Sequence, residues 1–411
     1  MQAATTTSGA CQGYSQAERF NATRRLSEAL VVSLSDADAT IQSMPDASPA
    51  KWHLAHTTWF FETFLLRDHL PGYARFDERW PFLFNSYYEA EGARHARAAR
   101  GLLSRPSLDE ILDWRRHVDQ AMQALLDRPD VSVLVELGIH HEQQHQELLL
   151  TDIKHALWCN PLGPAFADAA PFAPTEKDAP DWYEHPGGIA RIGHDGAGFA
   201  FDNEGPSHRV LLEPFALAGS LVSNRDWAAF IADGGYRTAS LWLSDGWAWV
   251  NAEGVSAPMY WRDDEAFTLS GWLARDPDAP VTHISYYEAD AFASWAGMRL
   301  PTEFEWEAIG QSHDASGGQQ LDVGASVNPV PSNALFGSTW QWTRSAYLPY
   351  PRFRPANGAV GEYNGKFMSG QFVLRGASCA TARGHSRSSY RNFFYPHQRW
   401  QFTGLRLAKD V

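Results

Sequence analysis

Residues 131–158, VSVLVELGIHHEQQHQELLLTDIKHALW, decide how the first half of this 411-residue chain folds. The stretch contains no proline and predicts one long helix. His141 and His145 are four positions apart, so they lie one turn apart on the same face of that helix. This face points mainly inward, because it also carries Leu134, Leu137, Leu148 and Asp152.

Three more helices are expected before this one, over residues 17–44, 50–66 and 108–126. Ser48 followed by Pro49 is a typical helix start, with a capping residue and then proline at the first helical position. Ser107 with Glu110 three positions later is a capping-box pattern. Four helices and one long connection, over about 70–106, predict a helical bundle whose interior suits a metal site.

The second half of the chain differs in composition. Five tryptophans fall in residues 1–181 and twelve in 182–411, and five prolines occur from Pro161 to Pro180. We therefore predict an all-α domain at 1–160, a Pro/Ala-rich linker at 161–180 and an α+β domain at 181–411. In the last domain we expect two helices, over 224–233 and 285–296, among short strands and long loops.

Composition excludes several classes of protein. The chain carries a net charge of −14, which argues against binding to nucleic-acid phosphates. No apolar run is long enough to span a membrane, and no secretory signal is visible at the N-terminus. The three cysteines are widely separated and form no CxxC, which fits a reducing cytoplasm. We expect small-molecule partners and a cytoplasmic location, with the oligomeric state open and a monomer acceptable.

The His141/His145 pair needs a third ligand from another helix if it binds a metal ion. On spacing alone, either His53 or His56 could face the bundle interior. Glu147 lies about 200° around the helix from His145 at 3.6 residues per turn, so it is a poor third ligand. Three imidazoles leave open positions on the metal, and imidazole suits Zn²⁺, Cu, Fe²⁺ and Ni alike.

Four stretches of the sequence resemble the ergothioneine-pathway sulfoxide synthases over essentially the whole chain. WHLAH at 52–56 with the later histidine pair matches an iron site. NSYYE at 85–89, with the arginines after it and GLLSRP at 101–106, matches a loop that enters the active site. RLPTEFEWE at 299–307, with LRGAS at 374–378 and GLRL at 404–407, matches the C-terminal fold. YRNFF at 390–394 matches a segment that lines the substrate pocket.

This resemblance implies a DinB-like four-helix bundle followed by a domain of the formylglycine-generating-enzyme and C-type-lectin-like fold. It implies an Fe²⁺- and O₂-dependent enzyme that joins a thiol sulfur to C2 of the imidazole of hercynine, Nα-trimethylhistidine, and leaves a sulfoxide. Formylglycine generation itself is not expected, because it needs two nearby cysteines and Cys379 stands alone. A structural Ca²⁺ in the C-terminal domain is left open.

The resemblance also implies a role for individual residues. It selects His56, with His141 and His145, as the iron ligands, and it gives Gln144 the task of orienting the hercynine imidazole. Either Tyr87 or Tyr88 would donate a proton, and Arg94 and Arg97 would bind the carboxylate of the sulfur donor. Asn392, Phe393 and Phe394 would hold the trimethylammonium and carboxylate end of hercynine.

The sequence leaves several alternatives open for the donor and for the reaction. Phe394 stands where the branch of the family that uses γ-glutamylcysteine has an acidic residue, so free cysteine is the favoured donor. Selenoneine synthases, which join hercynine to a selenosugar, resemble the same sequence closely. A Zn²⁺-dependent DinB-like thiol transferase or hydrolase, and a non-catalytic lectin-like module fused to a bundle, are the other readings.

Overall fold

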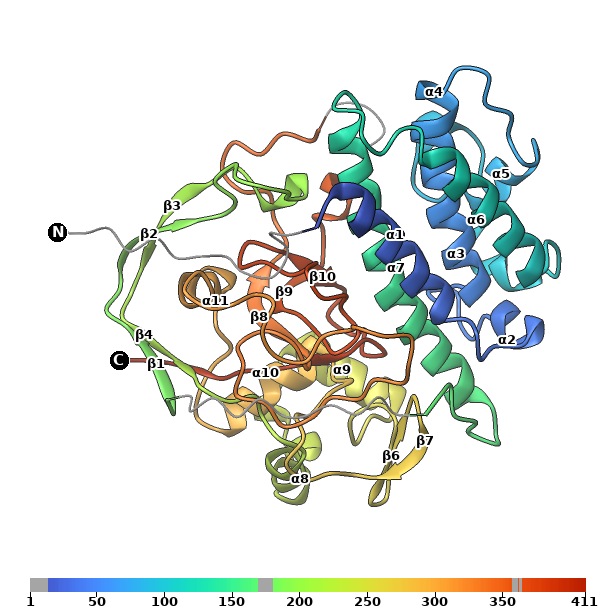
Figure 1. Cartoon of the computed structure of the whole chain (residues 1–411). Helices are drawn as coiled ribbons and strands as arrows, with labels where there is room; N and C mark the ends of the chain where they lie inside the picture. Colours follow the sequence, from blue (N-terminus) through green and yellow to red (C-terminus); the bar gives the residue numbers. More distant parts are fainter. Residues whose placement is uncertain (1–13, 169–179, 357–360, 362–363) are drawn as a thin grey trace.

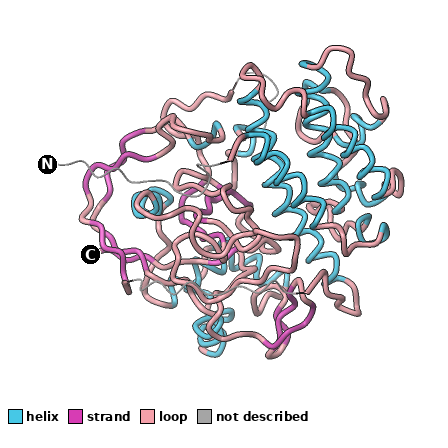
Figure 2. Tube along the Cα trace, viewed as in Figure 1, coloured by secondary structure: helices cyan, strands magenta, loops and turns pink. Residues whose placement is uncertain are grey.

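The computed structural model describes residues 14–168, 180–356, 361 and 364–411. Its N-terminal half is helical, and its C-terminal half combines short strands, helices and long loops (Figures 1 and 2). The predicted fold class, an all-α part followed by an α+β part, is confirmed. Among the described residues, no helix is long and apolar enough to cross a membrane.

Four long helices form the bundle: α1 (Gln16–Ala29), α3 (Ala50–Phe61), α6 (Leu108–Met122) and α7 (Ser132–Cys159). Helix α7 packs against α1 and α3, and α3 also packs against α6. The predicted capping box at the start of α6 is present, because the Ser107 side chain accepts from the Glu110 backbone N–H and Glu110 bonds back to Ser107.

Three helical predictions need correction. Ser48 does not cap α3, because Pro49 itself is the N-cap and no side chain caps this end. Residues 17–44 form two helices, because α2 (Asp36–Thr40) begins at a capping box of its own between Ser35 and Asp38. Helix α3 ends at Phe61, and the chain continues through a π-helical turn, Glu62–Leu66, into the short α4 (Arg67–His69).

The long connection between α4 and α6 contains only short helical pieces, and it carries Tyr87 and Tyr88. They are α5 (Trp80–Phe84) and two 3₁₀ turns, Glu89–Glu91 and Arg97–Leu102. Asn85 and Ser86 are buried in this connection, which therefore packs into the protein over part of its length.

The two helices predicted in the second half are confirmed as α8 (Asn224–Ala232) and α10 (Tyr286–Trp295). Two more helices are present that the sequence reading assigned to strands and loops, α9 (Ser244–Glu253) and α11 (Glu303–Gly310). Helix α11 starts with a capping box between Thr302 and Glu305, so its signal was present in the sequence but was overlooked.

The strands of the described residues form four small sheets. One pairs β2 (Gly188–Ile192) with β3 (His208–Leu212), and another joins β5 (Trp261–Arg262), β6 (Glu265–Thr268) and β7 (Gly271–Ala274). A third sheet joins β1 (Trp182–His185), β4 (Phe215–Ala218) and β12 (Ala408–Asp410). The fourth, in the order β10-β9-β8-β11, contains β8 (Trp340–Ala346), β9 (Phe372–Gly376), β10 (Asn392–Phe394) and β11 (Thr403–Gly404). The segment expected to line the substrate pocket is thus the edge strand β10, which pairs antiparallel with β9.

One buried hydrophobic cluster among the described residues spans both halves of the chain, whereas two further clusters lie within the C-terminal half. Leu150 and Ile153 of α7 belong to the same buried cluster as Tyr260, Trp400 and Phe402 of the second half. Residues 169–179 of the predicted linker lie outside the described part of the chain. The first residues of the linker pack against the C-terminal half, since Phe166 is buried and its backbone N–H donates to the Leu269 carbonyl at 2.8 Å. The predicted domain boundaries stay a prediction.

Candidate metal centre

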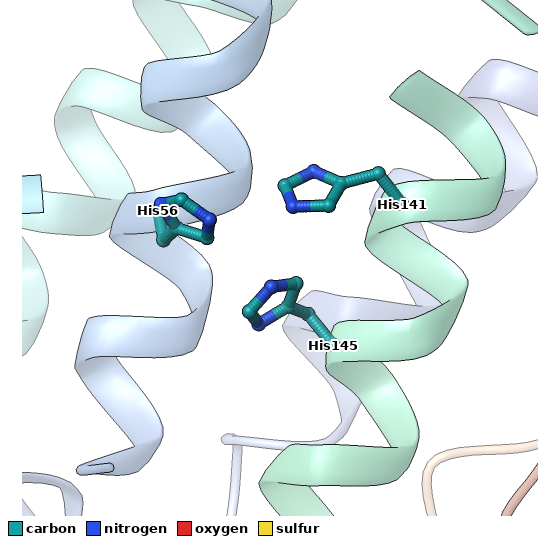
Figure 3. Close-up of side chains that lie close together, drawn as sticks. All are labelled: His56, His141 and His145. Carbon is teal, nitrogen blue, oxygen red and sulfur yellow. The ribbon is translucent and has the colours of Figure 1, made fainter. Parts of the chain in front are cut away.

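Three histidines from two helices face one another inside the bundle. His56 of α3 and the pair His141 and His145 of α7 each offer a ring nitrogen, and these three atoms lie within 4.8 Å of one another. Figure 3 shows the rings pointing toward a common point between the helices. The i, i+4 spacing on α7 produces this arrangement, because it places both imidazoles on the face that packs against α3.

The three imidazoles lie in surroundings that keep them neutral. Burial lowers the pKa of His141 to about 4. Burial, with the neighbouring imidazoles adding to it, lowers the pKa of His56 and His145 well below the usual histidine value. A metal ion needs the lone pair of a neutral imidazole, so the electrostatics of the cluster suit coordination.

The ring of His56 is fixed from three sides. It stacks between Trp52 and Trp59, with ring centroids 4.7 and 5.4 Å away. Its Nδ1 donates to the carbonyl oxygen of Phe84 at 2.6 Å, which leaves the lone pair on Nε2. A ring held this way needs little further ordering when a metal ion binds.

Glu147 does not join the cluster. Its carboxylate accepts hydrogen bonds from the Trp340 indole, at 2.6 Å, and from the Ser378 and Thr381 hydroxyls, both at 2.7 Å. Burial raises its pKa, although these three donors act in the opposite direction. Glu147 therefore links α7 to the C-terminal half, in agreement with its predicted position away from the metal-facing side of the helix.

The histidine cluster lines a cavity of about 310 Å³ between the bundle and the C-terminal half. Most of the predicted site residues line the same cavity: Tyr87, Tyr88, Arg97, Gln144, Asn392, Phe393 and Phe394. Arg94 does not line it, because its guanidinium forms an ion pair with Glu89 at the surface. The structure thus brings together residues that are far apart in the sequence.

Arg100 is a cavity residue to which the sequence analysis gave no role. It is only 4% exposed and lies over the ring of Trp52, 3.3 Å from the centroid. Its guanidinium donates to the hydroxyls of Ser48 and Ser86, and the nearby carboxylate of Asp152 acts on it through space. Burial, with Arg97 nearby, lowers its pKa to about 9. The spacing of Arg94, Arg97 and Arg100 at every third position was the available signal.

The two tyrosines occupy different environments. Tyr88 is buried, with its ring 5.4 Å from Trp59 and 5.2 Å from Phe64. Tyr87 is less enclosed, and its phenol oxygen accepts a hydrogen bond from Arg97 at 2.8 Å. Tyr88 therefore belongs to the aromatic shell around the histidines, whereas Tyr87 belongs to the guanidinium side of the cavity.

The remaining wall is formed by Gln144 and by aromatic residues of the C-terminal half. The Gln144 amide donates to the phenol oxygen of Tyr390 at 2.8 Å, and Tyr390 stacks on Trp340. Phe393 of strand β10 stacks on Tyr347 with centroids 4.1 Å apart. The sequence reading gave Tyr390 and Trp340 no separate role, because neither residue type marks a site without its neighbours.

Comparison with known proteins matches both halves of the chain. The model of the DinB superfamily matches residues 19–149, and that of the Sulfatase-modifying factor enzyme 1-like domain matches residues 168–330. The hercynine oxygenase of Mycolicibacterium thermoresistibile is 33% identical over 93% of this chain and 92% of its own length. The hercynine oxygenase of Mycobacterium tuberculosis is 32% identical over 93% of this chain and 95% of its own. Ergothioneine biosynthesis protein 1 of Schizosaccharomyces pombe is 30% identical over 52% of this chain and 28% of its own.

Proposed function

The chain belongs to the hercynine oxygenase family, and on that premise we propose that it is an Fe²⁺-dependent enzyme that uses O₂ to couple cysteine to C2 of the hercynine imidazole. One C–H bond and one S–H bond break, a C–S bond forms, one oxygen atom stays on sulfur as the sulfoxide and the other leaves as water. The observation that carries the proposal is the convergence of three neutral imidazoles on a cavity whose lining also includes aromatic rings and the guanidinium groups of Arg97 and Arg100.

The donor set fits ferrous iron. Three neutral imidazoles add no negative charge, and no described carboxylate joins the cluster. Iron(II) held by His56, His141 and His145 would supply open positions where a thiolate and O₂ can meet, and its charge would favour the thiolate over the thiol. The other residues of the cavity bind and orient the two organic substrates.

Hercynine fits the part of the cavity between Gln144 and strand β10. The Gln144 amide, held by Tyr390, can hydrogen-bond to an imidazole ring placed beside the histidine cluster. The trimethylammonium group would pack against an aromatic face such as Phe393, an attraction of roughly 0.5–2 kcal/mol. Asn392 adds polar contacts at the same end of the cavity.

The sulfur donor fits the side of the cavity that carries the guanidinium groups. Arg97 and Arg100 line the cavity, and the hydrogen bonds of Arg100 go to two serine hydroxyls and not to a carboxylate. A guanidinium binds a carboxylate through two parallel N–H donors, so this side suits an amino-acid carboxylate. This observation favours cysteine over a selenosugar, which carries no such group. Phe394 lines the cavity where a longer donor would meet an acidic residue in another branch of the family.

A phenol supports the coupling by supplying a proton as O₂ is reduced. Tyr88 packs against Trp59 and Phe60, and these two rings flank His56 and His141 respectively. Because the Tyr88 ring packs against the aromatic rings that flank the histidine cluster, we assign this role to Tyr88 and not to Tyr87. Tyr87, bound by Arg97, would instead help to hold the sulfur donor.

Metal and oxygen dependence test this proposal. The metal-free protein is reconstituted without air, with Fe²⁺ or with Zn²⁺, and offered hercynine and cysteine. We expect coupled product only with Fe²⁺ and only after O₂ is admitted. The His141→Ala variant should be inactive, and His155→Gln, on the same helix but outside the cavity, should resemble the parent. Turnover with Zn²⁺ under nitrogen would instead support a thiol transferase or hydrolase.

A further inference from the structure

His145 is joined to a buried carboxylate through a second imidazole. We propose that His53 and Asp152 are positioning residues that hold His145 in one orientation and one tautomer, with Nε2 toward the metal. This inference rests on the proposed metal site. It gives a role to His53 and Asp152, neither of which takes part in the proposed coupling reaction.

The chain of contacts is short and enclosed. Nδ1 of His53 lies 2.9 Å from Nδ1 of His145, and Nε2 of His53 lies 3.1 Å from Oδ2 of Asp152. The side chains of His53 and Asp152 are 3% and 5% exposed. His53 precedes the ligand His56 by about one turn of α3, and Asp152 follows His145 by about two turns of α7. The contacts therefore cross directly between the two helices that carry the metal ligands.

The partners of Asp152 fix the direction of the hydrogen bonds. Its Oδ2 accepts from the backbone N–H of Ser48 at 2.8 Å, and its Oδ1 accepts from the indole N–H of Trp400 at 3.3 Å. Both of these groups can only donate, so the carboxylate acts as an acceptor. His53 then donates to it from Nε2, and a neutral imidazole has only a lone pair left on Nδ1. That lone pair accepts a hydrogen bond from the Nδ1–H of His145, which leaves the lone pair of His145 on Nε2.

The three ligands consequently differ in what supports them. His56 donates to a backbone carbonyl, that of Phe84. Nδ1 of His141 has no hydrogen-bond partner among the described residues. Only His145 is connected to a carboxylate, and such a connection makes an imidazole a stronger donor to a metal ion. Through Trp400 the same carboxylate also contacts the C-terminal half, so docking of the two halves supports the position of this ligand.

Metal affinity without substrates tests the inference. Co²⁺ and Fe²⁺ affinities are measured without air by competition with a chelator, for the parent, His53→Leu, Asp152→Asn and His53→Gln. We expect His53→Leu and Asp152→Asn to bind about 10- to 100-fold more weakly. His53→Gln should recover part of the loss, because a glutamine offers both an acceptor and a donor. His155→Gln is the matched control, since this buried histidine of α7 bonds to Ser43 and should leave affinity unchanged.

The visible spectrum of the Co²⁺ protein adds a readout that a loss of packing alone would not give. The weakly binding variants, saturated with Co²⁺, should show shifted d–d bands, whereas the control should not. If His53→Leu or Asp152→Asn binds Co²⁺ with the parent affinity and spectrum, the inference is wrong. If the parent itself binds neither Co²⁺ nor Fe²⁺, it is the proposed metal site that fails.

The tautomers can also be read in the parent protein, which keeps the test valid if a variant does not fold. With ¹⁵N-labelled histidine and Zn²⁺ bound, long-range ¹H–¹⁵N spectra should show His145 protonated on Nδ1 and His53 protonated on Nε2. A proton on Nδ1 of His53 would overturn the inference, because that nitrogen could then no longer accept from His145.

Discussion

Arg100 shows how a single buried residue changes the interpretation of the site. Three arginines follow one another at every third position, and the sequence pattern could not rank them. In the structure Arg94 pairs with Glu89 at the surface, whereas Arg97 and Arg100 line the cavity. Because the guanidinium of Arg94 is already paired with a carboxylate, it is less able to bind the carboxylate of a substrate. The predicted donor site therefore shifts along the chain by one step of this spacing.

Replacing these arginines should separate their roles. In Arg97→Ala and Arg100→Lys, we expect the KM for cysteine to rise about 10- to 100-fold, because a hydrogen bond to a charged group contributes about 1.5–3 kcal/mol. Arg94→Ala is the matched control and should leave this KM unchanged. Steady-state kinetics with saturating hercynine measures the effect. An equal rise in the KM for cysteine in Arg94→Ala would show that Arg94 also contributes to binding of the sulfur donor.

The adjacent tyrosines should differ in the same way. In Tyr88→Phe we expect coupling to fall about 100-fold or more, the usual range for a lost proton donor, while cysteine oxidation continues. In Tyr87→Phe the ratio of coupling to oxidation should hold and the KM for cysteine should rise, because Tyr87 bonds to Arg97. Product analysis by mass spectrometry gives the ratio. An unchanged ratio in Tyr88→Phe would remove its proposed role.

At the scale of elements, α7 carries both the metal ligands and the contacts to the C-terminal half. The sequence predicted its length and its histidine face, because helical periodicity is a local property. The partners of its other face could not be predicted, since they come from residues more than a hundred positions away. Glu147 meets Trp340, and Lys154 meets His283. The π-helical turn after α3 could not be predicted from the sequence either, because no glycine or proline marks it.

Lys154 predicts a pH-dependent contribution to stability. Its ammonium is buried against the rings of Tyr260 and Phe402 and lies 2.5 Å from Nε2 of His283, with Cys379 also near. Burial lowers the pKa of Lys154 from 10.5 to about 7. The unfolded lysine keeps its proton up to about pH 10.5. Between these values the unfolded state binds more protons than the folded state, so this residue destabilises the fold less as pH rises.

The Lys154→Met variant tests this directly. We expect it to be more stable than the parent by a few kcal/mol below pH 7, where the parent must bury a charge. The difference should shrink as pH rises from 7 toward 10. Denaturant unfolding of both proteins at each pH gives the two curves. A difference that is constant with pH would mean that Lys154 is not the titrating group.

At the scale of the whole molecule, the two halves meet at the cavity and are joined by one of the buried hydrophobic clusters. The sequence predicted the fold class of each half correctly, but it gave no site role to any tryptophan of the second half. Trp340 and Trp400 line the cavity and bond to Glu147 and Asp152 of α7. These contacts depend on how the halves pack, which local patterns do not encode. One buried cluster contains residues of both halves.

Coincident unfolding of the halves follows from this shared core. Helical circular dichroism reports mainly on the bundle, and tryptophan fluorescence reports mainly on the second half, which holds twelve of the 17 tryptophans. We expect both signals to give the same midpoint in urea, as in a cooperative transition. Two separated midpoints would show that the halves are independent domains that only touch.

The proposed reaction is tested most directly by identifying its product. The Fe²⁺-reconstituted protein receives O₂ with hercynine and equal amounts of cysteine, γ-glutamylcysteine and a selenosugar, and mass spectrometry identifies the coupled product. We predict a hercynyl cysteine sulfoxide as the main product, and no coupled product from His56→Ala. A predominant carbon–selenium product, or no coupling with any donor in the presence of bound iron, would contradict the proposed function.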